Sequence, residues 1–97
     1  MRTVMVRYKT VAEHADTNAA LVRAVFEELR QRAPKGLRYA TYRLEDGVSF
    51  VHIATVDAEP NPLFSIAAFD AFQQRLKGRC VEPPVVTELS PVGSYGV

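Results

Sequence analysis

The stretch GLRYATYRLEDGVSFVHIATV, residues 36–56, decides the fold because it predicts two strands joined at Asp46-Gly47. An Asp-Gly pair between two apolar runs is among the strongest local signals for a β-hairpin. Alternation in the second strand gives two faces, and neither is polar: one carries Val48, Phe50, His52, Ala54 and Val56, the other Ser49, Val51, Ile53 and Thr55. One chain of 97 residues supplies helices for only one of these faces. We therefore expect a second copy of the chain to cover the other face.

The composition is that of one ordinary globular domain, residues 1–97. Lysine and arginine total 12 against 11 aspartate and glutamate residues, and no basic cluster stands out. Nucleic acids and anionic membranes bind clustered cations, so we expect neither as a partner. The single cysteine, Cys80, forms no intrachain disulfide and points to a reducing cytoplasm. The first ten residues lack a signal-peptide core, and no apolar run approaches the ~20 residues of a membrane helix.

Two segments complete the first half of the domain. Residues 2–10 alternate as a strand, with Tyr8 on its more apolar face. The following segment has an apolar stripe at spacings of three and four, which predicts a helix ending before Pro34. Two starts are open, because Thr10 with Glu13 fits a capping box and Asp16 fits a later cap.

A second helix and a last strand follow the hairpin. Asn61 is expected to cap a helical turn that Pro62 opens. A second helix then follows, with a stop near Gly78 and a buried side made of Ile66, Phe69, Phe72 and Leu76. Pro83 and Pro84 then stiffen the approach to a strand at residues 85–89. The order β-α-β-β-α-β predicts an α+β, ferredoxin-like plait, with two helices on one face of a four-stranded antiparallel sheet.

VMVRYKT at residues 4–10, the long helix and the hairpin together resemble the antibiotic-biosynthesis-monooxygenase-like superfamily of dimeric α/β barrels. The resemblance implies a homodimer in which two sheets pack face to face. It also implies a small, aromatic or polyketide-like ligand and a cofactor-independent oxygenase, an oxidoreductase. The haem-degrading branch of the superfamily uses a tryptophan, and this chain has none. Haem degradation is therefore disfavoured.

His52 is the candidate catalytic residue, because it is a titratable group in an otherwise apolar strand face. The competing interpretation is a paired histidine in the core or the dimer interface. Tyr8 and Asn61 are candidate polar contacts to a substrate. The candidate cavity wall comes from the second helix and comprises Phe64, Phe69 and Phe72. Tyr39 and Tyr42 are three apart on one strand, so they face opposite sides.

We expect no metal, haem or flavin, because two histidines and one cysteine offer no evident ligand set. Two other functions remain open. The same fold serves as a non-catalytic dimerisation or ligand-sensing module. An RNA-binding domain shares the element order, but Val48 stands where a stacking aromatic residue is expected, and the charge is nearly neutral.

Overall fold

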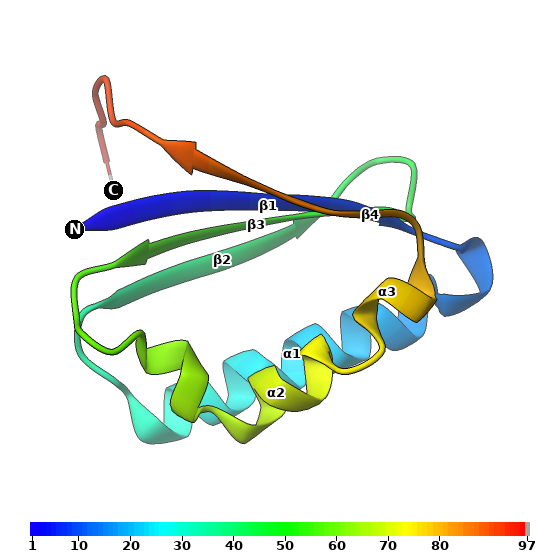
Figure 1. The fold of residues 1–97 in the computed structure, drawn as a ribbon, viewed down its shortest axis with the longest axis horizontal. Helices are drawn as coiled ribbons and strands as arrows, with labels where there is room; N and C mark the ends of the chain where they lie inside the picture. Colours follow the sequence, from blue (N-terminus) through cyan, green and yellow to red (C-terminus); the bar gives the residue numbers. More distant parts are fainter. Residues whose placement is uncertain (97) are drawn as a thin grey trace.

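The computed structural model describes residues 1–96 and confirms the α+β ferredoxin-like plait (Figure 1). One antiparallel sheet in the order β2-β3-β1-β4 contains β1 (Arg2–Thr10), β2 (Leu37–Arg43), β3 (Ser49–Val56) and β4 (Cys80–Leu89). The helices are α1 (Ala15–Arg32), α2 (Ala67–Gln73) and α3 (Leu76–Arg79), with 3-10 turns η1 (Ala12–His14) and η2 (Pro62–Ser65). In Figure 1 these three helices lie below the sheet, and within residues 1–96 no helix covers its upper face.

The predicted hairpin pairs β2 with β3, from Leu37 opposite Val56 to Arg43 opposite Phe50. The Asp46 side chain holds the loop together by accepting hydrogen bonds from the Ser49 hydroxyl and from the backbone amides of Ser49 and Val48. These hydrogen bonds favour the carboxylate and lower the pKa of Asp46 to about 2. The Asp-Gly pair therefore predicts the hairpin correctly because the hydrogen bonds of Asp46 stabilise the loop itself.

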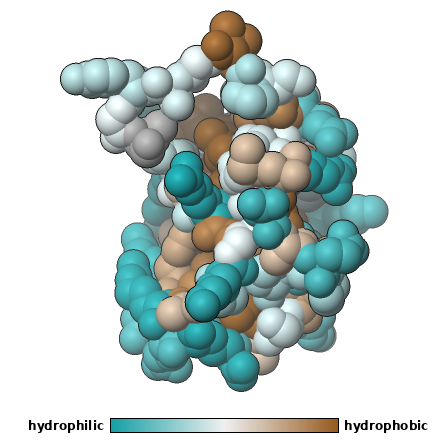
Figure 2. All heavy atoms as spheres, turned by 90° about the vertical axis from the view of Figure 1, so that its left-hand side faces the viewer, coloured by the Kyte–Doolittle hydropathy of each residue, from teal (hydrophilic) through white to brown (hydrophobic). Residues whose placement is uncertain are grey.

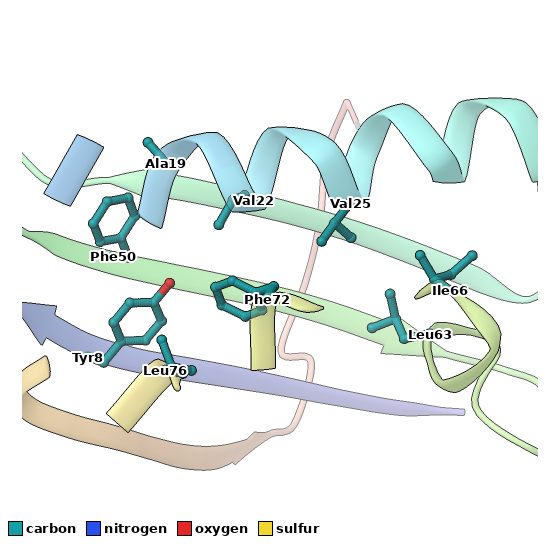
Figure 3. Packing of buried hydrophobic residues seen from close by; sticks show 9 residues of the cluster. All are labelled: Tyr8, Ala19, Val22, Val25, Phe50, Leu63, Ile66, Phe72 and Leu76. Atoms are coloured by element: carbon teal, nitrogen blue, oxygen red, sulfur yellow. The ribbon is translucent and has the colours of Figure 1, made fainter. Parts of the chain in front are cut away.

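The core lies between the sheet and the helices (Figure 3). Tyr8 of β1 and Phe50 of β3 stack with ring centroids 5.6 Å apart, and Phe72 of α2 closes over Tyr8 at 6.3 Å. The apolar stripe of α1, which packs on the same face of the sheet as α2, contributes Val22 and Val25. The face of β3 that carries Phe50, His52 and Ala54 is therefore directed at the helices.

The predicted helical turn after Asn61 is confirmed as η2, but the second helix that follows it is divided into α2 and α3, so the expectation of one helix there is wrong in detail. The backbone is extended at Ile66, between η2 and α2, and Arg75 is left-handed with φ 61° before α3. Side-chain hydrogen bonds to the backbone stabilise these breaks. The Glu28 carboxylate accepts from the first two amides of α2, Ala67 and Ala68, and Arg79 donates to two carbonyls near its end.

Neither predicted cap starts α1. Thr10 donates its hydroxyl proton to the Val48 carbonyl, and Asp16 pairs with Arg43 at 3.0 Å. The turn η1 leads directly into the helix, and His14 occupies the capping position without a side-chain hydrogen bond. Tertiary contacts have thus taken both candidate side chains away from the helix end.

The last strand is longer than predicted, because β4 already begins at Cys80 and includes both prolines. Its pairing with β1 shifts register between Lys9 and Arg7, where Pro83 and Pro84 lie. β4 is an edge strand, so prolines at this irregularity leave few ladder hydrogen bonds unmade. Because β4 lies at the edge of the sheet, it can contain Pro83 and Pro84 and still form a strand.

The upper sheet face carries apolar side chains alongside polar ones such as Arg7 and Arg38, although no element of residues 1–96 packs on it. Strand alternation directs seven apolar side chains to this face, namely Met5, Ala40, Tyr42, Val51, Ile53, Val85 and Leu89. The chain after β4 leaves the sheet on the same side (Figure 1), and Val92 and Tyr95 in it are almost fully exposed. We call the side chains of these seven residues the open sheet face.

The first testable prediction concerns Gly36, where β2 begins beside the end of β3. Gly36 has φ +78°, and a Cβ there would lie 2.7 Å from the Asp57 carbonyl oxygen. Gly36→Ala should lower the free energy of unfolding by about 2–3 kcal/mol, because it adds a backbone clash to left-handed strain. Gly47 has nearly the same φ, +77°, with open space around it. Gly47→Ala is therefore the control and should cost about 1 kcal/mol in the same urea titration; equal losses would show that the clash with Asp57 does not matter.

Candidate functional site

A cavity of about 850 Å³ lies between the sheet and the segment η2–α2. Its wall is aromatic, with Tyr8 and Tyr39 from the sheet and Phe64, Phe69 and Phe72 from the helical side. Figure 2 views the molecule from the end where β1 begins and β3 finishes, and hydrophobic side chains show there between hydrophilic ones. All six residues proposed from the sequence line this one cavity: Tyr8, His52, Asn61, Phe64, Phe69 and Phe72.

His52 is held by hydroxyl groups at both ring nitrogens. Its Nε2 lies 2.7 Å from the Tyr8 hydroxyl, and its Nδ1 lies 2.6 Å from the Tyr39 hydroxyl. Thr41, directly opposite His52 in the β2–β3 pairing, places its hydroxyl 2.9 Å from Nδ1. The imidazole is only 4% exposed. His52 is thus a fully bonded group at the inner end of the cavity.

Two further polar side chains extend this network behind Tyr8. Asn18 of α1 donates its side-chain amide to the Tyr8 hydroxyl at 2.8 Å. Arg79 donates its Nε–H to the Asn18 carbonyl oxygen at 3.1 Å and its terminal groups to the Phe72 and Gln74 carbonyls. Within residues 1–96 every buried side-chain nitrogen and oxygen has a partner. Burial of these polar groups is therefore compensated.

Burial keeps the titratable groups of this network uncharged. Loss of hydration lowers the pKa of His52 to about 4 and raises the pKa of Tyr39 to about 12. Burial also raises the pKa of Tyr8, and the hydrogen bond from Asn18 offsets only part of that change. At pH 7 the site contains a neutral imidazole and neutral phenols. These neutral groups donate and accept hydrogen bonds, and they carry no charge of their own at this pH.

The remaining predicted residues occupy different parts of the wall. Phe72 belongs to the core, and its ring lies 5.3 Å from the His52 ring. Phe69 is half-buried beside Phe72, whereas Phe64 is 76% exposed and lies at the rim. Asn61 accepts the Leu63 amide hydrogen as the predicted cap of η2. The side-chain oxygen Oδ1 of Asn61 is therefore already hydrogen-bonded, and its side-chain NH2 group is left for a ligand.

Sequence reasoning missed four members of the network. Asn18 had a signal, because it is a polar residue within the apolar stripe of α1, between Ala15 and Val22. Tyr39 was predicted only to face away from Tyr42, and this is confirmed, since Tyr39 points to His52 while Tyr42 is exposed on the open sheet face. Thr41 depends on strand register and Arg79 on tertiary contacts, and single-sequence patterns contain neither.

Other reactive groups show no comparable arrangement. In the part of the chain that the structure describes, no three histidine, cysteine, aspartate or glutamate side chains gather as metal ligands would. Burial raises the pKa of the Cys80 thiol despite the neighbouring Arg79, so an activated thiolate is not favoured. Among residues 1–96, no helix has the length and apolar character needed to cross a membrane.

No family model matches this sequence, and no curated protein matches it. Solved structures do match over nearly the whole chain. Rv0793 from Mycobacterium tuberculosis is 20% identical, with a TM-score of 0.75, and the match covers 96% of each chain. A protein described as an antibiotic biosynthesis monooxygenase is 19% identical, with a TM-score of 0.77 and coverage of 96% of this chain and 100% of the other.

A third match is a monooxygenase from the ActVA-Orf6 gene of Streptomyces coelicolor, solved in complex with nanaomycin D. It is 18% identical, with a TM-score of 0.64, and the match covers 97% of this chain and 89% of that one. The chain therefore has the fold of antibiotic-biosynthesis-monooxygenase-type proteins, and the resemblance predicted from its sequence is confirmed at the level of fold.

The pKa of His52 gives the second testable prediction. The unfolded chain protonates this residue near its ordinary value of 6.5, whereas the folded chain resists protonation down to about pH 4. Unfolding is therefore favoured as the pH falls through this interval. We expect wild type to lose about 3 kcal/mol more stability than His52→Gln between pH 7 and pH 4. Urea titrations at both pH values measure this difference, and parallel losses in the two proteins would contradict a buried neutral imidazole.

Proposed function

We propose that the protein is a homodimer that binds a small aromatic or polyketide-like molecule in the cavity and acts as a cofactor-independent monooxygenase. The observation that carries the proposal is the convergence of His52 and two tyrosine hydroxyls at the inner end of an aromatic-walled cavity. A cavity of about 850 Å³ lies within the usual range for small-molecule sites. The aromatic walls suit a planar ligand, and the hydroxyl groups suit its oxygen atoms.

The proposed reaction needs no reductant other than the substrate. A substrate methylene beside an aromatic ketone loses a proton to form an enolate, and the enolate carbon reacts with dioxygen. One oxygen atom becomes the new carbonyl oxygen, and the other leaves as water with the two hydrogens of the methylene. Hydrogen bonds to the substrate oxygen stabilise the enolate, and the cavity excludes water from it.

His52 acts in this proposal through hydrogen bonding. A histidine with a pKa of about 4 is a weak base at neutral pH, and both of its nitrogens already have partners. Removal of the methylene proton is then left to the substrate's own acid–base equilibrium in solvent, before the cavity encloses it. The protein contributes enclosure and stabilisation of negative charge on the oxygen.

The second candidate function is ligand binding without turnover. The observation in its favour is the same occupied imidazole, because no free base lies at the inner end of the cavity. The two candidates predict the same binding and differ only in oxygen consumption.

Homodimerisation through the open sheet face is the structural part of the proposal. Exposed apolar patches of this kind mark interaction sites in soluble proteins. The exposed Val92 and Tyr95, in the segment that leaves the same side of the sheet, extend the apolar surface that a second copy would cover. An isologous contact, in which each copy presents the same face, buries all of these side chains at once.

Cavity filling tests the binding site. Ala54 of β3 is buried and lines the cavity, so Ala54→Phe should weaken nanaomycin D binding at least about tenfold by occupying its space. Ala20→Phe on the exposed side of α1 is the matched control and should bind as wild type does. Titration calorimetry measures both affinities, and circular dichroism checks the fold. Binding that survives Ala54→Phe unchanged would place the ligand elsewhere.

Oxygen consumption with the anthrone dithranol distinguishes the two functions. A monooxygenase should consume oxygen above the rate in buffer, in a one-to-one ratio to substrate. Ala54→Phe should reduce that rate to the buffer value. Saturable dithranol binding with no added consumption would instead establish the ligand-binding module.

Two adjacent valines test the dimer. Val85 and Val86 are 61% and 62% exposed, but Val85 belongs to the open sheet face and Val86 lines the cavity. Val85→Glu should convert a dimer to a monomer of 10.8 kDa, because it buries a charge in the interface. Val86→Glu adds the same charge and should leave the dimer intact. Light scattering at micromolar concentration decides, and a monomeric wild type would refute the dimer.

A further inference from the structure

We infer that the buried network is a one-way chain of hydrogen bonds that ends on the Tyr39 hydroxyl and leaves its proton for an acceptor oxygen of the ligand. The order of donation is Arg79, Asn18, Tyr8, His52 and Tyr39. The direction of the chain follows from the chemistry of the groups alone. Only the ligand class at its end rests on the proposed function.

The chain has a fixed direction because it starts at an arginine. A guanidinium donates hydrogen bonds and never accepts them. Arg79 Nε lies 3.1 Å from Asn18 Oδ1, so that oxygen faces Arg79 and the amide nitrogen faces Tyr8. The Tyr8 oxygen therefore accepts a hydrogen bond from Asn18, and its own proton must go elsewhere.

The Tyr8 proton goes to His52. Tyr8 is 2% exposed, and among the described residues His52 Nε2, at 2.7 Å, is the remaining partner of its hydroxyl. If Nε2 accepts, then the single proton of a neutral imidazole is on Nδ1. The Arg79 guanidinium thus determines the tautomer of His52 although it does not touch the ring.

His52 in turn donates a hydrogen bond to side chains of β2. Its Nδ1–H donates toward the Tyr39 oxygen at 2.6 Å and the Thr41 oxygen at 2.9 Å. Tyr39, unlike Thr41, is among the residues that line the cavity. The Thr41 hydroxyl is also hydrogen-bonded to Tyr39. With Thr41 as the donor of that bond, the Tyr39 oxygen accepts from both neighbours, and Tyr39 presents its own O–H to the cavity. The matching ligand atom is an acceptor: a ketone, quinone or enolate oxygen.

The chain assigns distinct roles to its members. Tyr39 is the group that contacts the ligand, and its ring is held by stacking on Phe26 of α1 with centroids 5.0 Å apart. His52, Asn18 and Arg79 are positioning residues that orient the Tyr39 hydroxyl. Stronger donation by Tyr39 to an enolate than to a ketone would favour the charged form.

The tautomer of His52 tests the direction without any ligand. Two-bond proton–nitrogen correlation spectra of nitrogen-15-labelled protein distinguish the protonated ring nitrogen from the bare one. The chain has only two histidines, so His14→Gln assigns the signals. We expect the proton on Nδ1 of His52 at pH 7. A proton on Nε2 would overturn the inference.

Asn18→Asp should reverse the chain with little change in shape. The aspartate accepts from both Arg79 and Tyr8, so the Tyr8 oxygen must then accept from His52 Nε2–H. The tautomer should switch, Tyr39 should donate to His52, and nanaomycin D should bind about tenfold more weakly. An unchanged tautomer in folded Asn18→Asp would overturn the inference.

Tyr39→Phe removes the terminal donor and keeps the rest of the chain. His52 should retain its Nδ1 proton through Thr41, while nanaomycin D should bind about tenfold more weakly. Tyr42→Phe, on the other face of the same strand, is the control and should change neither measurement. Wild-type affinity in Tyr39→Phe would overturn the assignment of Tyr39. If nanaomycin D fails to bind wild type, the proposed function loses its support. The His52 tautomers of wild type and of Asn18→Asp still test the direction of the hydrogen-bond chain, because they need no ligand.

Discussion

The buried guanidinium of Arg79 is the constraint on which the helical layer and the cavity both depend. A charged group that is only 8% exposed needs hydrogen-bond partners, because an unpaired buried charge is very costly. Arg79 finds these partners in the Asn18 side chain and in the Phe72 and Gln74 carbonyls. It therefore joins the end of α2 to the side of α1, and it lies behind the tyrosine that touches His52.

This one residue links the irregular backbone to the site. The carbonyls at the end of α2 are free to accept from Arg79 because the helix stops there and Arg75 turns the chain with a left-handed backbone. Glu28 serves the opposite end of the same helix by accepting from the Ala67 and Ala68 amides, and these hydrogen bonds lower its pKa. The short helix that forms one wall of the cavity is thus fixed at its start by Glu28 of α1 and at its end by Arg79, which follows a few residues later in the chain.

The sequence predicts those parts of the fold whose causes are local. The hairpin follows from Asp46-Gly47, and the opposite orientations of Tyr39 and Tyr42 follow from strand alternation. The prediction of an unbroken second helix was wrong because its start depends on Glu28, which lies far away in the sequence, and its interruption at Arg75 depends on how Arg79 packs against the Phe72 and Gln74 carbonyls. The start of α1 failed for the same reason, since Thr10 and Asp16 bond to the hairpin.

The residues of the candidate site likewise differ in whether a local sequence pattern or the tertiary structure reveals them. His52 could be selected from sequence because a titratable residue interrupts an apolar strand face, and its neighbour Tyr8 lies on the matching face of the first strand. Thr41 required the register that places it opposite His52. Asn18 left a trace as a polar residue in an apolar stripe, but its partner could be known only after α1 was packed on β1.

The prolines of β4 have a consequence for the behaviour of the protein at high concentration. An unpaired edge strand offers a row of amides and carbonyls to which a strand of another molecule can add, and this leads to aggregation. Pro83 and Pro84 have no amide hydrogen to donate to an added strand, and the pairing of β4 with β1 is irregular beside them. At the opposite edge, β2 carries the exposed Arg38, whose positive charge opposes edge-to-edge pairing of identical molecules. Each edge of the sheet thus has a feature that opposes polymerisation, and one of these features, Pro84, also lines the cavity.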